Sequence, residues 1–134
     1  MSTNFPYTVL YYLSSTGESP FSKFLDSLEK RQQAKIIRSF HYFKEFGLEA
    51  IRKHTKKLTG TPLWELKIVG KDSIRIIYFL PRVRTMIVLH GFVKKKQKIP
   101  KGELDLAMQR FQDWKKRSTW QVTSYKISFG YHEK

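Results

Sequence analysis

The sequence contains no cysteine, which excludes disulfide bridges and metal sites built from thiolates. Its four histidines are scattered and do not form a zinc-binding pattern. No apolar run approaches the roughly 18 residues that a membrane-spanning helix requires. The N-terminal segment Met1–Pro6 lacks a basic leader followed by an apolar core. These absences predict a cytoplasmic protein with no membrane partner.

Acidic residues are also scarce. Eleven Asp and Glu stand against 26 Lys and Arg, which gives a formal net charge of +15 at pH 7. This charge indicates a polyanionic partner such as nucleic acid, an anionic membrane surface or an acidic protein. The 134 residues, 40% of them hydrophobic, suffice for one core. We expect one domain over residues 1–117 and a tail, residues 118–134, that adds a strand to a sheet edge or binds a partner.

Three strand-like runs occupy the middle of the chain. Leu63–Ile68 alternates between apolar and polar positions, as a half-buried strand does. Ile74–Leu80 and Met86–Val93 are rich in Ile, Val and aromatic residues, which is typical of strands buried on both faces. Turn residues at Gly70–Ser73 and a short connection at Arg82–Thr85 join the runs. The pattern predicts an antiparallel meander.

The flanking segments predict helices and one further strand. Residues 7–13 are a strand candidate, and Pro20 follows Ser19 as the first residue of a helix follows its N-cap. Helical periodicity then indicates helices over residues 32–46 and 102–116. The expected class is α+β: a small antiparallel sheet of about four strands, with two N-terminal helices packed on it and a C-terminal helix.

Three polar residues interrupt the apolar meander: Lys67, Arg75 and His90. A buried, unpaired charge is costly, so each must face solvent on a concave surface or hold a partner. One interpretation is a functional site. The other is an exposed strand face on which Arg75 and Lys67 pair with Glu65 or Asp72, with His90 as a structural strand residue. The residues alone leave both interpretations open.

Cationic residues flank the meander and predict an RNA-binding patch, because lysines grip the phosphate backbone and nearby aromatic rings stack on bases. Runs of this kind can also be no more than solvated surface, and the pattern does not distinguish RNA binding from RNA cleavage. The residues expected to bind RNA or the ribosome are Lys56, Lys57, Lys94, Lys95, Lys96 and Lys98.

Five short motifs together resemble the RelE/ParE superfamily of type II toxins, most closely its phage-related HigB-like branch. The resemblance covers residues 7–117. It implies a RelE-like fold and an endoribonuclease that cleaves messenger RNA on the ribosome, held inactive by a cognate antitoxin, commonly a helix-turn-helix protein. The motifs are Lys57-Leu58 followed by Gly60, Trp64–Lys67, Arg75–Tyr78, Leu89–Phe92, and Lys94-Lys95 with Pro100.

The resemblance also implies catalytic roles without a metal or other cofactor. The RNA 2′-hydroxyl attacks the adjacent phosphodiester while side chains neutralise charge and move protons. Arg75 matches the strand arginine of the family and would bind phosphate. Lys67 adds charge where the branch more often has arginine, and His90 is the candidate general acid or base. Glu65 is either the base or an ion-pair partner of Lys67.

Two other functions remain compatible with the sequence. ParE-like members of the superfamily poison DNA gyrase, so likeness of fold does not decide activity. Retention of Arg75 and His90 favours the nuclease over the gyrase poison. A non-catalytic RNA- or ribosome-binding module would also need only the basic patch, and it would bind RNA without cutting it.

Overall fold

The computed structural model describes residues 5–95, 99–120 and 131–133. A short 3₁₀ turn, Arg52–His54, precedes the second strand. The elements in chain order are β1 (Thr8–Tyr12), α1 (Pro20–Asp26), α2 (Lys30–Phe46), α3 (Leu48–Ile51), β2 (Thr55–Lys57), β3 (Trp64–Lys67), β4 (Ile74–Arg82), β5 (Thr85–Val93), α4 (Lys101–Trp120) and β6 (Tyr131–Glu133).

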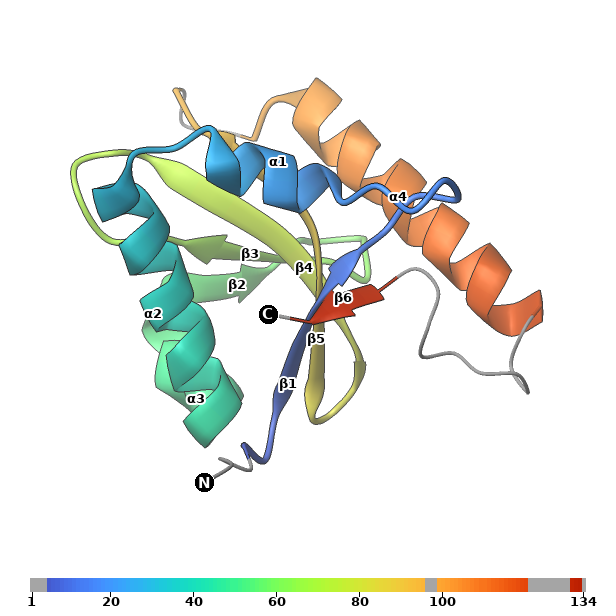
Figure 1. Ribbon diagram of the computed structural model, residues 1–134, viewed down its shortest axis with the longest axis horizontal. Helices are drawn as coiled ribbons and strands as arrows, with labels where there is room; N and C mark the ends of the chain where they lie inside the picture. Colours follow the sequence, from blue (N-terminus) through green and yellow to red (C-terminus); the bar gives the residue numbers. More distant parts are fainter. Residues whose placement is uncertain (1–4, 96–98, 121–130, 134) are drawn as a thin grey trace.

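The strands form one six-stranded sheet in the order β2-β3-β4-β5-β1-β6 (Figure 1). β1 runs parallel to β5, and every other neighbouring pair is antiparallel. The predicted meander is therefore confirmed as β3-β4-β5, and the α+β class is confirmed with it. The sheet is wider than the predicted four strands because β2 extends it on one side and β6 on the other.

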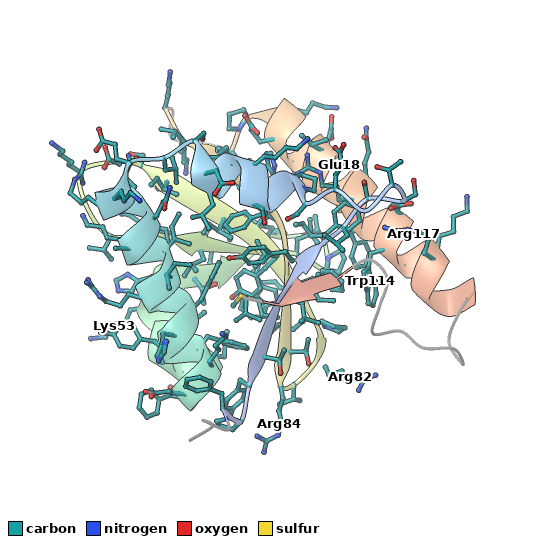
Figure 2. All side chains as sticks on the ribbon, viewed as in Figure 1. Glu18, Lys53, Arg82, Arg84, Trp114 and Arg117 are labelled. Atoms are coloured by element: carbon teal, nitrogen blue, oxygen red, sulfur yellow. The ribbon has the colours of Figure 1, made fainter. Side chains whose placement is uncertain are left out.

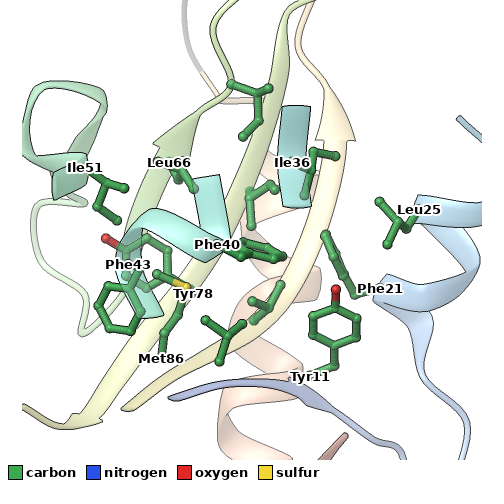
Figure 3. Close-up of a cluster of buried hydrophobic side chains, with 14 of the residues drawn as sticks. Tyr11, Phe21, Leu25, Ile36, Phe40, Phe43, Ile51, Leu66, Tyr78 and Met86 are labelled. Atoms are coloured by element: carbon green, nitrogen blue, oxygen red, sulfur yellow. The ribbon is translucent and has the colours of Figure 1, made fainter. Parts of the chain in front are cut away.

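Helices α1, α2 and α3 cover one face of this sheet. The Ser19 hydroxyl accepts a hydrogen bond from the Ser22 backbone N–H at 3.1 Å, so the predicted N-cap of α1 is confirmed. Rings from three elements meet beneath the helices: Phe21 lies 4.8 Å from Tyr11 and 5.9 Å from Phe40, centroid to centroid (Figure 3). The buried apolar stripes of α1 and α2 thus supply core, as their helical spacing predicts.

Helix α4 covers the opposite face, over β4, β5 and β1. Phe79 of β4 packs edge-on against Phe111 and Trp114 at 4.9 and 4.8 Å between centroids. Both faces of β4 are therefore buried along much of its length. This arrangement confirms the expectation that the continuous apolar runs are strands covered on two sides.

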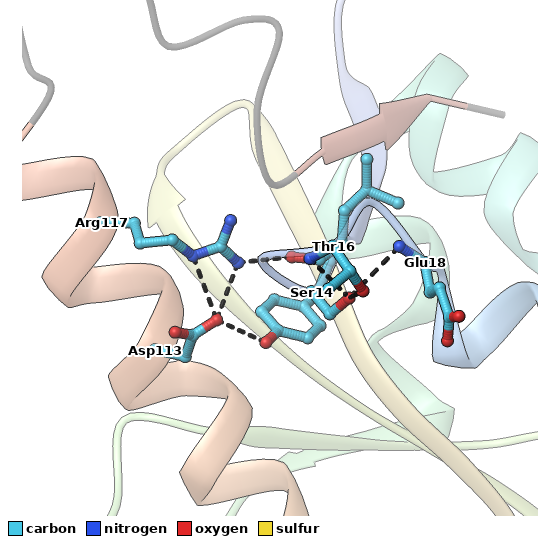
Figure 4. Close-up of polar contacts among 7 residues, drawn as sticks. Ser14, Thr16, Glu18, Asp113 and Arg117 are labelled. Atoms are coloured by element: carbon cyan, nitrogen blue, oxygen red, sulfur yellow. Dashed lines mark hydrogen bonds and ion pairs between the residues drawn. The ribbon is translucent and has the colours of Figure 1, made fainter.

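The end of α4 is fastened to the end of β1 by a polar network. The Tyr12 hydroxyl donates to Asp113 at 2.5 Å, and Arg117 donates to the same carboxylate at 2.7 Å and to the Leu13 carbonyl (Figure 4). Burial and the Asp113 contact raise the pKa of Tyr12 to about 12, so it remains a donor at neutral pH. These contacts hold the last turns of α4, which continues to Trp120.

The described parts of the tail differ from the prediction at residues 118–120 and agree with it at β6. Residues 118–120, assigned to the tail by the sequence, continue α4, since Asp113 and Arg117 already stabilise that turn. β6 pairs antiparallel with β1 and so extends the sheet edge. Residues 121–130 of the tail lie outside the described residues.

Residues 48–59, for which the sequence analysis predicts no element, contain α3, the 3₁₀ turn and β2. Gly47 ends α2 with a φ of 81°, a conformation that other residues rarely adopt. A Cβ atom at Gly47 would lie 2.7 Å from the ring of Tyr7, which directly precedes β1, so this close approach also requires glycine there. The turn at Gly47 leads from α2 into α3.

No helix in the described part of the chain is both long and apolar enough to cross a membrane.

Candidate functional site

Strand register places the four predicted catalytic residues on the sheet face that carries α4. Arg75 of β4 lies opposite Lys67 of β3 on one side and Phe92 of β5 on the other. In the next row, Ile77 separates Glu65 of β3 from His90 of β5. Because residues two apart on a strand share a face, the two rows form one surface. The meander therefore brings together residues that are up to 25 positions apart in the sequence.

Arg75 and Glu65 form a nearly buried ion pair. The Arg75 Nε atom lies 3.3 Å from Glu65 Oε2, and the two side chains are 13% and 4% exposed. Lys56 of β2 approaches the other carboxylate oxygen at 3.6 Å from an exposed position. A carboxylate at this depth is tolerated because two cations compensate its charge. We name this trio, Lys56, Glu65 and Arg75, the Arg75 cluster.

The ion pairing corrects part of the sequence interpretation. Glu65 pairs with Arg75 and Lys56, not with Lys67, because residues two apart on a strand are about 7 Å apart while the long arginine reaches across diagonally. Asp72 instead contacts Arg31 of α2 at 3.2 Å. Lys67 is exposed and makes no ion pair with any residue that the structure describes. Lys67 thus stands opposite Arg75 in the register of β3 and β4, with its side chain exposed.

His90 occupies a different environment, beneath α4. Its Nε2 atom lies 2.5 Å from the Glu103 carboxylate, and its Nδ1 atom lies 3.0 Å from Nη1 of Arg110. The same Nη1 atom donates to the Leu89 carbonyl at 2.9 Å. Since a guanidinium can only donate, Nδ1 accepts and Nε2–H donates to Glu103. We name His90, Glu103 and Arg110 the His90 cluster.

The surroundings of His90 favour its neutral form. Burial lowers the pKa of His90 because it removes the imidazolium from water, and the Arg110 charge lowers it further. The Glu103 contact opposes both effects without reversing them. Both ring nitrogens are thus engaged by α4, and a role in proton transfer requires one of these contacts to open.

Glu103 and Arg110 were missed by the sequence analysis. Their seven-residue spacing places both on one side of α4, two turns apart, where they can bracket a single side chain. Two charged residues on the core side of an amphipathic helix are the signal that could have identified them. The helix position was predicted, but its placement over His90 was not.

Three of the predicted RNA-binding lysines, Lys56, Lys94 and Lys95, lie near this surface. Lys57 is exposed on the opposite sheet face, where its ammonium lies 5.9 Å from the centre of the Trp64 ring. Lys94 directly follows β5, and its N–H donates to the Ser73 carbonyl at 2.6 Å, which sets it near the start of β4 and so near Arg75. Lys95 is exposed next to it. Lys96 and Lys98 lie outside the described residues.

Residues able to hold a metal ion are not grouped in the described part of the chain: no cluster of three or more His, Asp or Glu side chains has suitable geometry there. The chemistry available at this surface is therefore that of its own side chains: two guanidinium groups, several ammonium groups, two carboxylates and one imidazole. That set can bind a phosphodiester and exchange protons with it.

Comparison with known proteins identifies one family. The family described as phage-derived protein Gp49-like (DUF891) matches residues 23–112. The matched segment runs from α1 into α4 and contains both clusters. Among curated proteins, none matches the chain.

Proposed function

The chain belongs to the Gp49-like family of phage-derived proteins, and from this premise we propose that it is the toxin of a type II toxin–antitoxin pair. We place it in the HigB-like branch of the RelE/ParE superfamily, as an endoribonuclease that acts on ribosome-bound messenger RNA. One observation carries the activity: a largely buried arginine, Arg75, is held by a carboxylate at 3.3 Å and stands in register with the exposed Lys67.

The arginine is suited to the scissile phosphate. Its planar guanidinium can donate two parallel hydrogen bonds to phosphate oxygens, and its charge is fixed at any physiological pH. During 2′-hydroxyl attack, negative charge accumulates on those oxygens, so a preorganised cation stabilises the transition state more than the ground state. Lys67 and Lys94 would add charge around the same group.

We assign the two proton transfers to Glu65 of the Arg75 cluster and to the neighbouring Lys67. An incoming phosphate competes with Glu65 for Arg75, because both are oxyanions that fit the same guanidinium. The displaced carboxylate then accepts the proton of the 2′-hydroxyl as the 2′ oxygen bonds to phosphorus. The bond to the 5′ oxygen breaks, and that oxygen takes a proton from Lys67. The products are a cyclic phosphate and a free 5′-hydroxyl.

The proposed partners follow from the charge and the family. A net charge of +15 steers the chain toward ribosomal and messenger RNA, with strongly salt-dependent binding. A cognate antitoxin, of helix-turn-helix type in the proposed branch, would hold the toxin inactive. No cofactor is required by the proposed steps.

A second candidate is a non-catalytic RNA- or ribosome-binding module. The observation that favours it is the His90 cluster, in which both imidazole nitrogens are already engaged by α4. A chain with this histidine locked and its one buried carboxylate committed to Arg75 would still bind RNA. It would lack a group positioned to move protons.

The test is to incubate the purified chain with a defined messenger RNA, with and without programmed ribosomes, and to map the RNA ends. Arg75→Lys keeps a cation beside Glu65 but loses the two-pronged donor, so it separates catalysis from folding. Arg82→Lys is the matched control, because Arg82 extends from the β4–β5 hairpin into solvent (Figure 2). Wild-type and Arg82→Lys chains should cut ribosome-bound RNA, and Arg75→Lys should be at least about 100-fold slower.

Equal cleavage by Arg75→Lys and wild type would remove Arg75 from the site. Ribosome or RNA binding without new RNA ends would favour the binding module. Inhibition of purified DNA gyrase, with RNA left intact, would instead place the chain with the ParE-like poisons.

A further inference from the structure

Exposed apolar side chains concentrate along α2, on the sheet face opposite the Arg75 cluster. Among the described residues, six large hydrophobic side chains are exposed, and three of them belong to this one helix. Tyr42 is 47% exposed and Phe46 63%, and the two are one turn apart on the same side of α2, whereas Ile37 lies on another side of the helix. A fourth, Val69, is 57% exposed just beyond β3 and faces the helix across a groove. Such clustering typically marks an interaction surface.

The groove between α2 and β3 has a volume of about 320 Å³. Its α2 wall consists of residues 35, 38, 39 and 42, which follow the i, i+3, i+4, i+7 spacing of one helix side. Seven residues of helix rise about 10 Å, so the groove runs along roughly two turns. Ile51, Leu66 and Ile68 form an aliphatic floor that belongs to the main core. We name this feature the α2 groove.

The rim of the α2 groove is cationic. Lys35, Arg38 and His54 line it, and the Lys35 ammonium lies over Gly70 at one end. Within the described residues, neither Lys35 nor Arg38 forms an ion pair. The nearby acids are already committed, since Asp72 contacts Arg31 and Glu49 contacts Arg52. The rim therefore presents positive charge without a counter-charge of its own.

We propose that the α2 groove docks an amphipathic helix of a partner protein, one whose apolar side chains enter the groove while flanking carboxylates meet Lys35 and Arg38. A helix with anchors at i, i+3, i+4 and i+7 matches a two-turn groove with an aliphatic floor. A second copy of this chain is a poor occupant because two chains of charge +15 repel. RNA is also disfavoured, because the floor of the groove is Ile and Leu, and Tyr42 is the one Phe, Tyr or Trp side chain among its lining residues on which a base could stack.

This inference goes beyond the proposed nuclease activity and does not depend on it. The floor residue Leu66 and the catalytic candidate Glu65 are neighbours on β3 whose side chains point to opposite sheet faces. An occupied α2 groove would thus leave Arg75 open to its own ligand. Binding at the two faces should be independent unless the partner is large enough to extend around the sheet edge.

The experiment is an NMR titration of the full-length ¹⁵N-labelled chain with a 16-residue helical peptide that carries Leu at i, i+3, i+4 and i+7 and Glu at the flanking positions. A peptide with Lys in place of Glu and a 12-nucleotide single-stranded RNA are the comparison ligands. We expect saturable shifts at Arg38, Tyr42 and Val69 with the Glu peptide alone. Arg38→Glu should weaken its binding at least about 10-fold, whereas the matched exposed variant Arg82→Glu should change it less than twofold.

An apolar pair of variants tests the groove itself. Val69→Ser should weaken binding of the Glu peptide, and Val83→Ser, at an even more exposed valine on the β4–β5 hairpin, should not. Absence of saturation, equal binding of the Lys peptide, or equal loss in the Arg38→Glu and Arg82→Glu chains would overturn the proposal. Shifts at these residues with RNA rather than peptide would assign the α2 groove to nucleic acid instead.

Discussion

The Arg75 and His90 clusters lie on one sheet face, with Arg75 and His90 in adjacent rows, yet their environments differ. Arg75 pairs with a carboxylate from the neighbouring strand and has exposed lysines beside it, so an anionic ligand can compete for its guanidinium. His90 is bracketed by Glu103 and Arg110 of a helix that lies over it. Helix α4 covers His90 and leaves Arg75 uncovered. The Arg75 cluster can therefore exchange partners, whereas the His90 cluster joins α4 to the sheet.

The largest effect should come from breaking the Arg75 cluster. Arg75→Ala leaves the buried Glu65 with only the more distant Lys56, and removing one partner of a buried pair costs about 3 kcal/mol of unfolding free energy. Glu65→Gln in the same chain should recover most of that loss because it removes the stranded charge. Urea denaturation of the wild type, both single variants and the double variant measures the coupling. Additive losses would mean that the pair is not energetically linked.

A smaller loss should follow from His90→Phe, which keeps a ring of similar size but removes both nitrogens. The variant leaves the Arg110 bond to the Leu89 carbonyl intact, so we expect a loss of about 1–2 kcal/mol in unfolding free energy. Hydrogen exchange should localise the effect to α4 and β5. If amide protection fell in α2 as much as in α4 and β5, the His90 cluster would not stabilise α4 locally.

The His90 cluster should also make stability depend on pH. The pKa of His90 in the folded chain lies below the usual histidine value near 6.5. As the pH falls, His90 therefore binds its proton in the unfolded chain before it does so in the folded chain. The stabilisation is complete above about pH 6.5 and declines as the pH drops toward the folded pKa. Urea midpoints from pH 7.5 to 5 should fall more for the wild type than for His90→Phe. The exposed-histidine variant His54→Gln is the control and should follow the wild type.

Much of the fold was predictable because its signals are local. Each of these signals predicts the structure of the segment in which it lies. They are the alternation in Leu63–Ile68, the apolar runs of β4 and β5, and the Ser19-Pro20 start of α1. The parallel pairing of β1 with β5 was not predictable. The two segments are more than 70 residues apart, and nothing in either sequence indicates the other as its partner. Edge strand β2 was equally hidden, since a three-residue strand has too few positions to show a period.

The candidate site, like the fold, was predictable where its signals are local and not where they depend on long-range packing. Polar residues inside apolar strands identified Lys67, Arg75 and His90, because such residues must be explained energetically. Which partner each takes depends on register and on long-range packing. The sequence names Glu65 as a possible partner of both Arg75 and Lys67, and the structure selects Arg75. Helix α4 supplies two partners for His90 that no strand pattern could indicate.

The smallest expected effect sharpens the comparison from the Arg75 side. Lys67 is exposed in the row of Arg75, where the proposed branch more often has arginine, and a guanidinium there could contact phosphate with two donors. If Lys67 only supplies charge, Lys67→Arg should bind RNA a few-fold more tightly with unchanged cleavage of the bound substrate. If Lys67 protonates the 5′ oxygen, the variant should bind more tightly yet cleave more slowly, because guanidinium does not release a proton near neutral pH. Single-turnover cleavage rates at saturating RNA separate these outcomes, with the exposed hairpin variant Arg82→Lys as the control. The second outcome would identify Lys67, in the same row as Arg75, as the proton donor.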